Sequence, residues 1–419
     1  MAMMMDDKKR KGCTVITTAM EMFTDNGDII TKIFTHLPVK SLFRFKCVSK
    51  HWLSLISDPT FSQKHYSFHR PSPDSSISSF FLQPAPRIFD YLSPEFAPID
   101  RPNSGVPDPS LSFLEEGFEL KNSCNGLLFC QRNMGEDITY CVCNPTIMEY
   151  KLLPQLPKNK FIYCSSIVFD PSKSPHYKVV CVSRTKLKHV GIDIYSSQTG
   201  LWRASVEAFY EDRWLLNEKG VLWNGALHWT TLRKSFVSFH VERESFWTTK
   251  MPPKSSRSDS QTCRYFGESN GHLYFIETDD SCKTILPIEF DIWEMEHDYS
   301  QWCVRYHVNL DAMVKAYPEM LVPRVIYFNP DKEKYPERGP LCVSFTVLHL
   351  LLQERGEEVL WIYIPGKIIK YQIRDGTFVD YYDLPRRTYY GLHFSGYSWH
   401  DVFKFSNTLS SVQSSHSLC

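Results

Sequence analysis

No segment of this 419-residue sequence is apolar over a long enough stretch to span a membrane. The most apolar run covers residues 345–352 and is interrupted by His349, whereas a spanning helix needs about 20 apolar residues. Residues 1–11 are polar and basic and contain no apolar core of a secretory signal. Basic and acidic residues balance at 47 each, so no overall field attracts nucleic acid or an anionic surface. We therefore expect neither nucleic acid nor a membrane among the partners.

The motifs that usually mark catalysis or metal binding are also missing. The sequence contains no glycine-rich phosphate loop and no His-Glu-x-x-His helix. Its 13 cysteines include no Cys-x-x-Cys pair, the spacing that commonly marks a zinc or thiol-redox site. We interpret His65 and His69, four residues apart, as a surface pair, and the cluster at residues 296–298 as a solvated turn. We predict no catalytic residue, no cofactor and no metal.

Cysteine usage also indicates a compartment. Cys141 and Cys143 lie two apart on an expected strand, where an extended backbone holds them too far apart for an unstrained disulfide. No N-glycosylation acceptor with a permitted middle residue occurs. An intracellular, reduced protein of the nucleus and/or cytoplasm is the simplest interpretation. The basic run at residues 8–11 could direct nuclear import, but a solvated chain end is the favoured alternative.

Residues 25–61 carry more apolar side chain than so short a segment can bury by itself. Three apolar runs at helical spacing, separated at Pro38 and Ser49, predict three small helices ending at Asp58. A unit of about 40 residues needs a staple or a partner to fold firmly. Cys47 is its single cysteine, so no internal disulfide is possible. We expect another protein to cover its surplus apolar surface.

Residues 37–52 and 55–59 resemble the F-box motif in the form common in land plants. The resemblance implies binding to a Skp-family adaptor, which bridges to a cullin and RING ubiquitin ligase. We expect Ile29, Ile33, Phe34 and Leu37 to form one stripe of the first helix, and Trp52 to be a rigid anchor. The expected adaptor-binding residues are Ile29, Ile33, Phe34, Leu37, Pro38, Leu42, Phe45, Val48, Ser49 and Trp52.

The segment also departs from the F-box pattern at its start. The motif usually opens with Leu-Pro and has an acidic residue further on, whereas Asn26, Gly27 and Lys32 stand here. These departures predict weaker adaptor binding. They leave open a second reading, in which the segment is a degenerate F-box of a protein-interaction scaffold outside any ligase.

Proline and serine dominate the next segment, residues 67–112. Prolines recur too often there for a helix, so we expect a semi-rigid or irregular spacer. Its aromatic residues, Phe80, Phe81, Phe89, Tyr91 and Phe96, indicate that it packs along a neighbouring surface.

A succession of short strands follows, over residues 113–406. Three Asn-Gly pairs, at residues 125–126, 224–225 and 270–271, each precede an apolar alternation and predict hairpins. A strand, a polar turn and an aromatic residue recur at Trp202, Trp247 and Trp302. Their spacing of roughly 50 residues is close to the period of a propeller blade. A β-sandwich or two smaller β domains is the alternative.

Several short pieces of this stretch resemble the F-box-associated, kelch-like repeat domain of plant F-box proteins. They lie at residues 123–127, 143–146, 153–154, 169–171, 177–180, 223–225 and 384–385. We therefore expect an α+β multidomain chain: a small three-helix F-box followed by a mainly antiparallel, kelch-like β-propeller. The expected boundaries are a disordered start at 1–22, the F-box at 23–66, the spacer at 67–112, the propeller at 113–406 and a disordered tail at 407–419.

This organisation predicts a non-catalytic substrate receptor of a Skp–cullin–F-box ubiquitin ligase. The first domain would bind the adaptor, and loops of one propeller face would hold an unknown target protein. Residues 255–260 and an insertion at 329–340 are candidate contact loops by position alone. A propeller enzyme or glycan-binding protein is a third class, since propellers host many functions.

Overall fold

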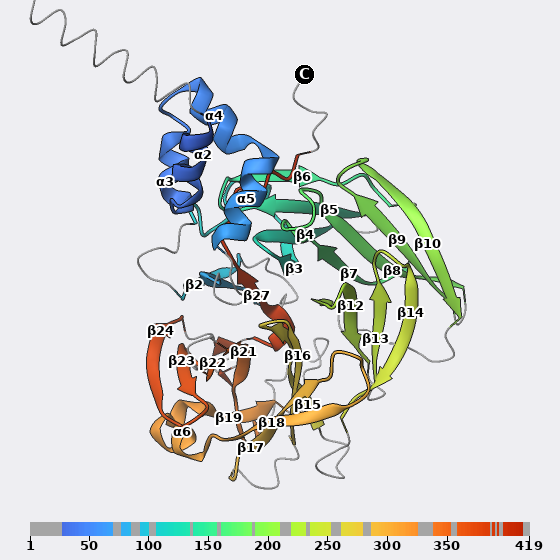
Figure 1. Cartoon of the computed structure of the whole chain (residues 1–419). Coiled ribbons are helices and arrows are strands. Elements are labelled where there is room, and N and C mark those ends of the chain that lie inside the picture. Colours follow the sequence, from blue (N-terminus) through green and yellow to red (C-terminus); the bar gives the residue numbers. More distant parts are fainter. Residues whose placement is uncertain are drawn as a thin grey trace, which may run out of the picture.

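A helical module and a ring of β-sheets make up the protein (Figure 1). The computed structural model describes residues 27–69, 77–84, 93–99, 106–134, 137–156, 161–186, 189–209, 219–231, 235–252, 261–279, 286–325, 338–352, 358–385, 388–389, 392–393 and 397–413. The predicted disordered start, the basic run at 8–11, the candidate loop at 255–260 and most of the insertion at 329–340 lie outside these residues.

The helical module contains four helices rather than the three expected. They are α2 (Gly27–Thr35), α3 (Val39–Phe45), α4 (Lys50–Ser57) and α5 (Pro59–His69). Pro38 precedes α3, and the Ser49 hydroxyl accepts a hydrogen bond from the Trp52 backbone N–H at 3.1 Å, which caps α4. The expected stop at Asp58 is instead the start of α5, because the Asp58 carboxylate accepts from the Thr60 N–H at 2.6 Å and the proline at position 59 suits a first helical turn.

Within the described residues, six antiparallel sheets form a closed β-propeller. Five are four-stranded meanders, and the sixth has three strands. In chain order, the five contain β3 (Glu119–Cys124), β4 (Leu127–Met134), β5 (Asp137–Asn144) and β6 (Glu149–Leu152); β7 (Phe161–Val168), β8 (Lys178–Lys186), β9 (His189–Ser196) and β10 (Leu201–Phe209); β11 (Val221–Trp223), β12 (Ala226–Thr230), β13 (Ser235–His240) and β14 (Ser245–Lys250); β15 (Gln261–Ser269), β16 (His272–Asp279), β17 (Glu289–Met295) and β18 (Trp302–Asn309); and β21 (Thr346–Leu352), β22 (Glu358–Ile364), β23 (Lys367–Gln372) and β24 (Phe378–Asp383).

Among the described residues, two further pairs of strands and three short helices connect the blades. The strands are β19 (Leu321–Val325) with β20 (Arg338–Val343), and β25 (Thr388–Tyr389) with β26 (Leu392–His393). The helices are α6 (Asp311–Ala316), η2 (Pro318–Met320) and η3 (Trp399–Asp401). Of these elements, α6, η2 and β19 precede the insertion expected at residues 329–340, and β20 overlaps its end.

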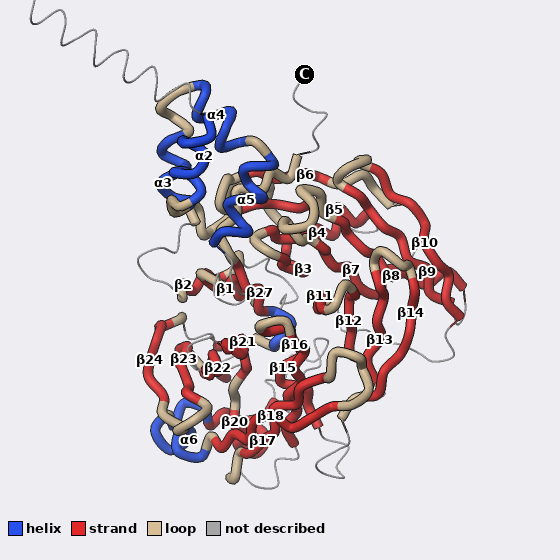
Figure 2. The backbone as a smooth tube through the Cα atoms, viewed as in Figure 1, coloured by secondary structure: helices blue, strands red, loops and turns tan. Residues whose placement is uncertain are grey.

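The first strand of each full blade lies innermost in the ring (Figure 2), and neighbouring first strands such as β3 and β7, or β15 and β21, lie close together. Apolar clusters fill the spaces between neighbouring blades: one joins Tyr274 and Ile292 to Ile362, and another joins Phe129 to Tyr195. Each blade therefore buries its faces on its neighbours, as in other radial repeats.

The Asn-Gly hairpins occur where the sequence predicts them. Asn125, Asn224 and Asn270 have φ values of 48°, 50° and 47°, and each following glycine also has positive φ. Positive φ at both central residues matches the right-handed twist of the strands that the turn joins. These three turns connect the first and second strands of the β3, β11 and β15 blades.

Two of the recurring tryptophans, Trp202 and Trp302, form hydrogen bonds to the preceding blade. The Trp202 indole N–H in β10 donates to the carbonyl of Pro154, which follows β6 of the preceding blade, at 2.6 Å. Trp302 in β18 donates in the same way to Lys250 at the end of β14, at 2.9 Å. The repeat seen in the sequence is thus a repeat of contacts between blades.

The Pro/Ser-rich segment is not only a spacer, which corrects the expectation for residues 67–112. It contains β1 (Ser79–Leu82) and β2 (Glu95–Pro98), and β1 lies between β2 and β27 (Val402–Phe405) in the sixth sheet. Phe80 and Phe81 are fully buried there, which confirms for these two that the aromatics of the segment pack on a neighbouring surface. Phe89 and Tyr91 lie outside the described residues. The ring closes because strands from both ends of the propeller sequence pair with each other.

The segment after β27 corrects the expectation of a disordered tail over its first half. Residues 407–413 are described, and Thr408, Leu409, Ser410 and Val412 are buried. Leu409 joins the core of the helical module, whereas Val412 joins the cluster between the first two blades. We call residues 406–413 the tail wedge.

Candidate functional site

The helical module has a small core of its own. Phe34 contacts Trp52 and Phe45, with ring centroids 5.0 and 5.5 Å apart, and Phe34 and Leu42 are buried. This arrangement corrects the predicted stripe, because Ile30 and Phe34 face the core while Ile29 and Ile33 face outward. Phe34 and Leu42 thus hold the module together and are not accessible to a partner in this arrangement.

The module also exposes apolar side chains that nothing in the described chain covers. Ile29 is 42% exposed, Ile33 is 52% exposed, Val48 is 60% exposed and Leu53 is 45% exposed. Exposed aliphatic side chains gathered on one small unit indicate a contact surface for a partner. The sequence prediction missed Leu53, although its position three residues after Lys50 on α4 would have indicated a solvent-facing site. We call these four residues the apolar helix surface.

The other predicted contact residues differ in exposure. Pro38 and Ser49 are exposed at helix starts, and Leu37, Phe45 and Trp52 are half-buried. The same module carries four exposed basic residues, Lys32, Lys40, Arg44 and Lys50. The module therefore exposes both aliphatic and basic side chains.

Contacts of α5 attach the helical module to the propeller. The Ser62 hydroxyl lies 3.3 Å from that of Ser410 in the tail wedge. Gln63 donates to the Ser172 carbonyl of the propeller at 2.9 Å.

His65 of α5 makes a contact within the helical module. It donates from Nε2 to the Leu37 carbonyl at 2.8 Å. Burial lowers the pKa of His65 to about 4, so the buried ring is neutral. His65 is therefore a buried structural residue, which corrects its assignment to a surface pair with the exposed His69.

A cavity of about 1000 Å³ occupies the central channel of the propeller. Side chains of the inner strands β3, β7, β11, β15, β21 and β27 line it, and Tyr66 and Ser67 of α5 reach its edge. Its volume suits an occupant at the upper end of the usual range for bound ligands. The channel is therefore a second candidate site, beside the apolar helix surface.

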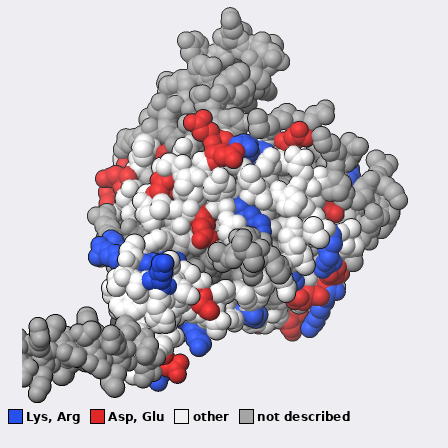
Figure 3. Space-filling view, turned by 90° about the horizontal axis from the view of Figure 1, so that it is seen from above, with Lys and Arg blue, Asp and Glu red and all other residues white. Residues whose placement is uncertain are grey.

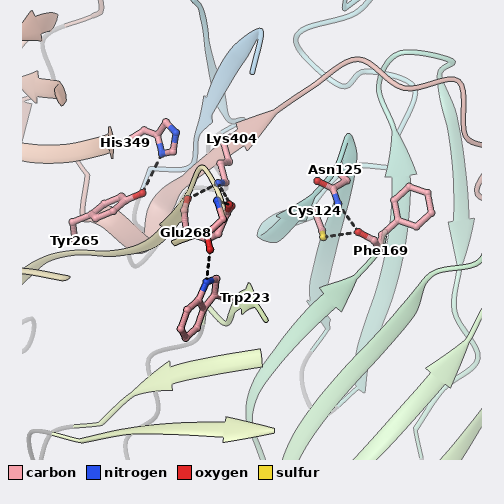
Figure 4. Close-up of polar contacts among 9 residues, drawn as sticks. Cys124, Asn125, Phe169, Trp223, Tyr265, Glu268, His349 and Lys404 are labelled. Carbon is pink, nitrogen blue, oxygen red and sulfur yellow. Dashed lines mark hydrogen bonds and ion pairs between the residues drawn. The ribbon is translucent and has the colours of Figure 1, made fainter. Parts of the chain in front are cut away.

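Polar contacts between blades hold the channel wall in place (Figure 4). The Tyr265 hydroxyl of β15 lies 3.1 Å from His349 Nδ1 of β21, and the Trp223 indole N–H donates to the Gly271 carbonyl at 2.7 Å. Cys124 and Asn125 both donate to the Phe169 carbonyl, at 3.2 and 2.6 Å. Because these contacts join different blades, the wall is built before any occupant arrives.

Lysines and carboxylates line the channel in nearly equal number. Lys404 Nζ lies 2.9 Å from Glu268 Oε2, and two more pairs, Lys178 with Glu242 and Lys173 with Asp170, lie nearer the edge at 2.7 and 3.1 Å. A fourth lysine, Lys219, donates to the Val402 carbonyl. No carboxylate of the described residues forms an ion pair with Lys219, so the lining contains one lysine without a paired carboxylate.

One face of the molecule shows no dominant charge where it is coloured. Seen from above, its basic and acidic residues are interspersed among uncharged ones (Figure 3). Among the described residues, no group of three or more histidine, cysteine, aspartate or glutamate side chains could hold a metal ion. Within those same residues, no helix has the length and apolarity to cross a membrane. The predicted turn at residues 296–298 is present between β17 and β18.

Comparison with known proteins agrees with this architecture. Residues 27–64 match the F-box domain family, and residues 94–335 match the family described as F-box associated beta propeller domain. The F-box protein At5g07610 of Arabidopsis thaliana is 30% identical over 97% of this chain and 96% of its own length. A second Arabidopsis thaliana protein, F-box protein At5g49610, is 26% identical over 70% of this chain and 80% of its own length. No comparison tests the kelch-like character of the repeats, which stays a prediction.

Proposed function

Because the chain belongs to the family of F-box proteins with an F-box associated β-propeller domain, we propose that it is a substrate receptor of a Skp–cullin–F-box ubiquitin ligase. The F-box would bind a Skp-family adaptor, and the propeller would bind a target protein. The observation that carries the proposal is the apolar helix surface, an exposed aliphatic patch on a module that the tail wedge ties to the propeller.

The role proposed for the chain is positional rather than chemical. A ligase assembly that holds a target lysine beside a charged ubiquitin-conjugating enzyme turns a rare collision into an effectively unimolecular step. Such positioning needs a fixed distance between adaptor and target. The contacts of Ser62 and Gln63 with the tail wedge and the propeller support it, because they join α5 to the β-domain directly. We place this assembly in the nucleus and/or cytoplasm.

The exposed basic residues of the helical module add a prediction about the partner. Lys32, Lys40, Arg44 and Lys50 are all exposed on this module, so an adaptor with an acidic contact face would be steered to it. Lys32 stands where the F-box pattern usually has an acidic residue, and here it adds to the positive charge of the module. We therefore expect association to slow as the salt concentration rises.

Replacement of one exposed residue tests the proposal. Ile33→Asp places a charge in the centre of the apolar helix surface without touching the module's core, because Ile33 is 52% exposed. We expect binding of a co-expressed plant Skp-family adaptor to weaken by at least about tenfold, as measured by interferometry on the full chain. Leu201→Asp is the matched control, because Leu201 is 66% exposed on β10, away from the helices.

The two possible results separate the candidate functions. Loss of adaptor binding in Ile33→Asp, with binding retained in Leu201→Asp and both variants folded, supports the receptor function. If the unaltered chain fails to bind any Skp-family adaptor, or if Ile33→Asp binds as well as it does, the ligase assignment is wrong. The reading as a protein-interaction scaffold with a degenerate F-box then replaces it.

A further inference from the structure

The position of Lys219 in the channel is fixed by its neighbours. The next residue, Gly220, donates from its N–H to the Ser166 hydroxyl at 3.0 Å and accepts from the Asn122 amide at 2.9 Å. A Cβ on Gly220 would lie 2.4 Å from the Ser166 hydroxyl oxygen, so no other residue fits there without displacing the wall. The backbone that carries Lys219 is therefore held between the β3, β7 and β11 blades.

The Lys219 side chain extends from this anchor to the closing blade. Its ammonium group donates to the Val402 carbonyl and lies 5.2 Å from the ring centroid of Phe403 and 5.9 Å from that of Trp399. A carbonyl and two aromatic faces stabilise a cation but do not neutralise it. Lys404, whose ammonium is paired with Glu268, reaches into the same space from β27.

Electrostatics at Lys219 favour the arrival of an anion. Burial and the nearby Lys404 lower the pKa of Lys219 to about 7, and Asp401 offsets this in part. The Asp401 carboxylate already accepts a hydrogen bond from the Ser398 N–H at 2.8 Å in the cap of η3. An opposite charge placed against a half-buried lysine favours its charged form, so binding an anion here would offset the partial desolvation of Lys219.

We propose that the channel is the target-binding site and that it receives an acidic segment of the target protein, whose carboxylate pairs with Lys219. This inference rests on the proposed receptor function and names the chemistry that the receptor recognises. The lining contains four lysines and three carboxylates, and each carboxylate is already paired with a lysine. One aspartate or glutamate side chain of the target would give the fourth lysine, Lys219, a partner.

Size and charge support this occupant over others. The volume of about 1000 Å³ leaves room for several residues around the acidic one, and the aromatic rings of Trp223, Phe266 and Trp399 offer apolar contact beside the cation. A phosphorylated side chain would bring about −1.5 to −2 charges, more than the single unmatched lysine balances. Because α5 lies at the channel edge, a segment bound there would be held next to the helical module.

Peptide pools presented to the full chain, co-purified with its adaptor, test the inference. The probes are short peptides of randomised sequence, capped at both ends, with glutamate, glutamine or phosphoserine fixed at the centre. We expect the glutamate pool to be retained at least about tenfold better than the glutamine pool, the scale of one enclosed charge pair. Lys219→Met should bring that ratio close to one.

A matched control and a folding control accompany this comparison. Lys315→Met removes an exposed lysine on α6 that does not line the channel, and it should leave the ratio unchanged. Lys219→Met should melt at about the same temperature or higher, because it removes a half-buried charge that has no paired carboxylate among the described residues. Should Lys219→Met fail to fold, Lys219→Gln replaces it in the same comparison.

The results that would overturn the inference are distinct from those that concern the ligase. Equal retention of the glutamate and glutamine pools, better retention of the phosphoserine pool, or an unchanged ratio in Lys219→Met would each refute a carboxylate site at Lys219. Adaptor binding is measured on the same preparations. Adaptor binding without glutamate preference refutes the channel site alone, whereas glutamate preference without adaptor binding refutes the ligase assignment alone.

Discussion

Two adjacent residues of α2, Ile33 and Phe34, have opposite surroundings. Phe34 is 3% exposed and packs against Trp52, whereas Ile33 is 52% exposed. Both are strongly apolar, so composition does not distinguish a core residue from a contact residue. The helical period does, once Phe34 is recognised as the inward residue, because Ile30 lies four positions earlier on the same face. The surplus apolar content of the module thus divides between a core and an exposed surface.

Buried histidines make stability depend on pH. His65 and His228 both have a pKa lowered to about 4 by burial, against an ordinary value near 6.5. Between these values the unfolded chain binds protons that the folded chain does not, so the free energy of unfolding falls as pH decreases from about 6.5 to 4. His69 adds to the effect at His65 through repulsion, while the Leu37 carbonyl opposes it.

We expect His65→Gln to reduce the acid sensitivity of the helical module. Glutamine can donate to the Leu37 carbonyl without taking up a proton, so the loss of up to about 3 kcal/mol near pH 4 from this site should disappear. Denaturant unfolding at pH 7 and pH 4.5, followed by hydrogen exchange in α2–α5, measures the difference. An equal loss of protection on acidification in both proteins would contradict the assignment of His65 as the titrating group.

At the scale of elements, three hairpin turns of one type have different neighbours. Gly126 and Gly271 both follow an asparagine and have φ values of +88° and +82°. A Cβ on Gly271 would meet nothing within 4 Å, whereas one on Gly126 would lie 2.5 Å from both the Ser406 carbonyl oxygen and the Thr408 methyl group. The tail wedge therefore packs directly against the turn between β3 and β4 in the first blade.

The two glycines form a matched pair for substitution. Gly271→Ala should cost about 1–2 kcal/mol of unfolding free energy from backbone strain alone. Gly126→Ala should cost about 1–3 kcal/mol more, because it also forces the tail wedge out of its site. Equilibrium denaturation of both variants gives the comparison. Similar losses would show that the tail wedge does not depend on close approach to this turn.

At the scale of the whole molecule, the tail wedge joins the two domains. Asn144 of β5 donates to the Thr408 and Ser410 carbonyls at 3.0 and 2.7 Å, and the Tyr177 hydroxyl donates to the Val412 carbonyl at 3.2 Å. Leu409 completes the core of the helical module. The partner that the short F-box segment needs to fold firmly is thus supplied partly by its own chain.

Two truncations separate the tail wedge from the residues beyond it. Removal of residues 407–419 should cost the helical module about 2–5 kcal/mol, because it deletes the buried Leu409. Removal of residues 414–419 alone, which leaves the tail wedge intact, should cost little. Hydrogen exchange of α2–α5 in the two truncated proteins measures the effect. Identical protection in both would mean that the wedge does not stabilise the module.

Local sequence by itself determined the helices of the F-box, the Asn-Gly hairpins and the repeat of blades. Each follows from residues close together in the chain: the Ser49 cap, the positive φ tolerated by Asn125, and the periodic Trp202 and Trp302. A short-range rule therefore suffices for them. Even so, the same rules ended the helices at Asp58, although α5 follows, and they did not separate the buried Phe34 and Leu42 from the exposed residues.

Only the tertiary structure decided how the ring closes, what covers the F-box core and where the unmatched charge lies. Ser79 pairs with Phe405, Leu409 packs against the helical module, and Lys219 reaches Val402. These partners stand between about 180 and 380 residues apart, and the entropy of closing such long loops is offset only by the burial that the finished ring provides. No pattern within one stretch of sequence reports such contacts, because they exist only when all the blades are assembled.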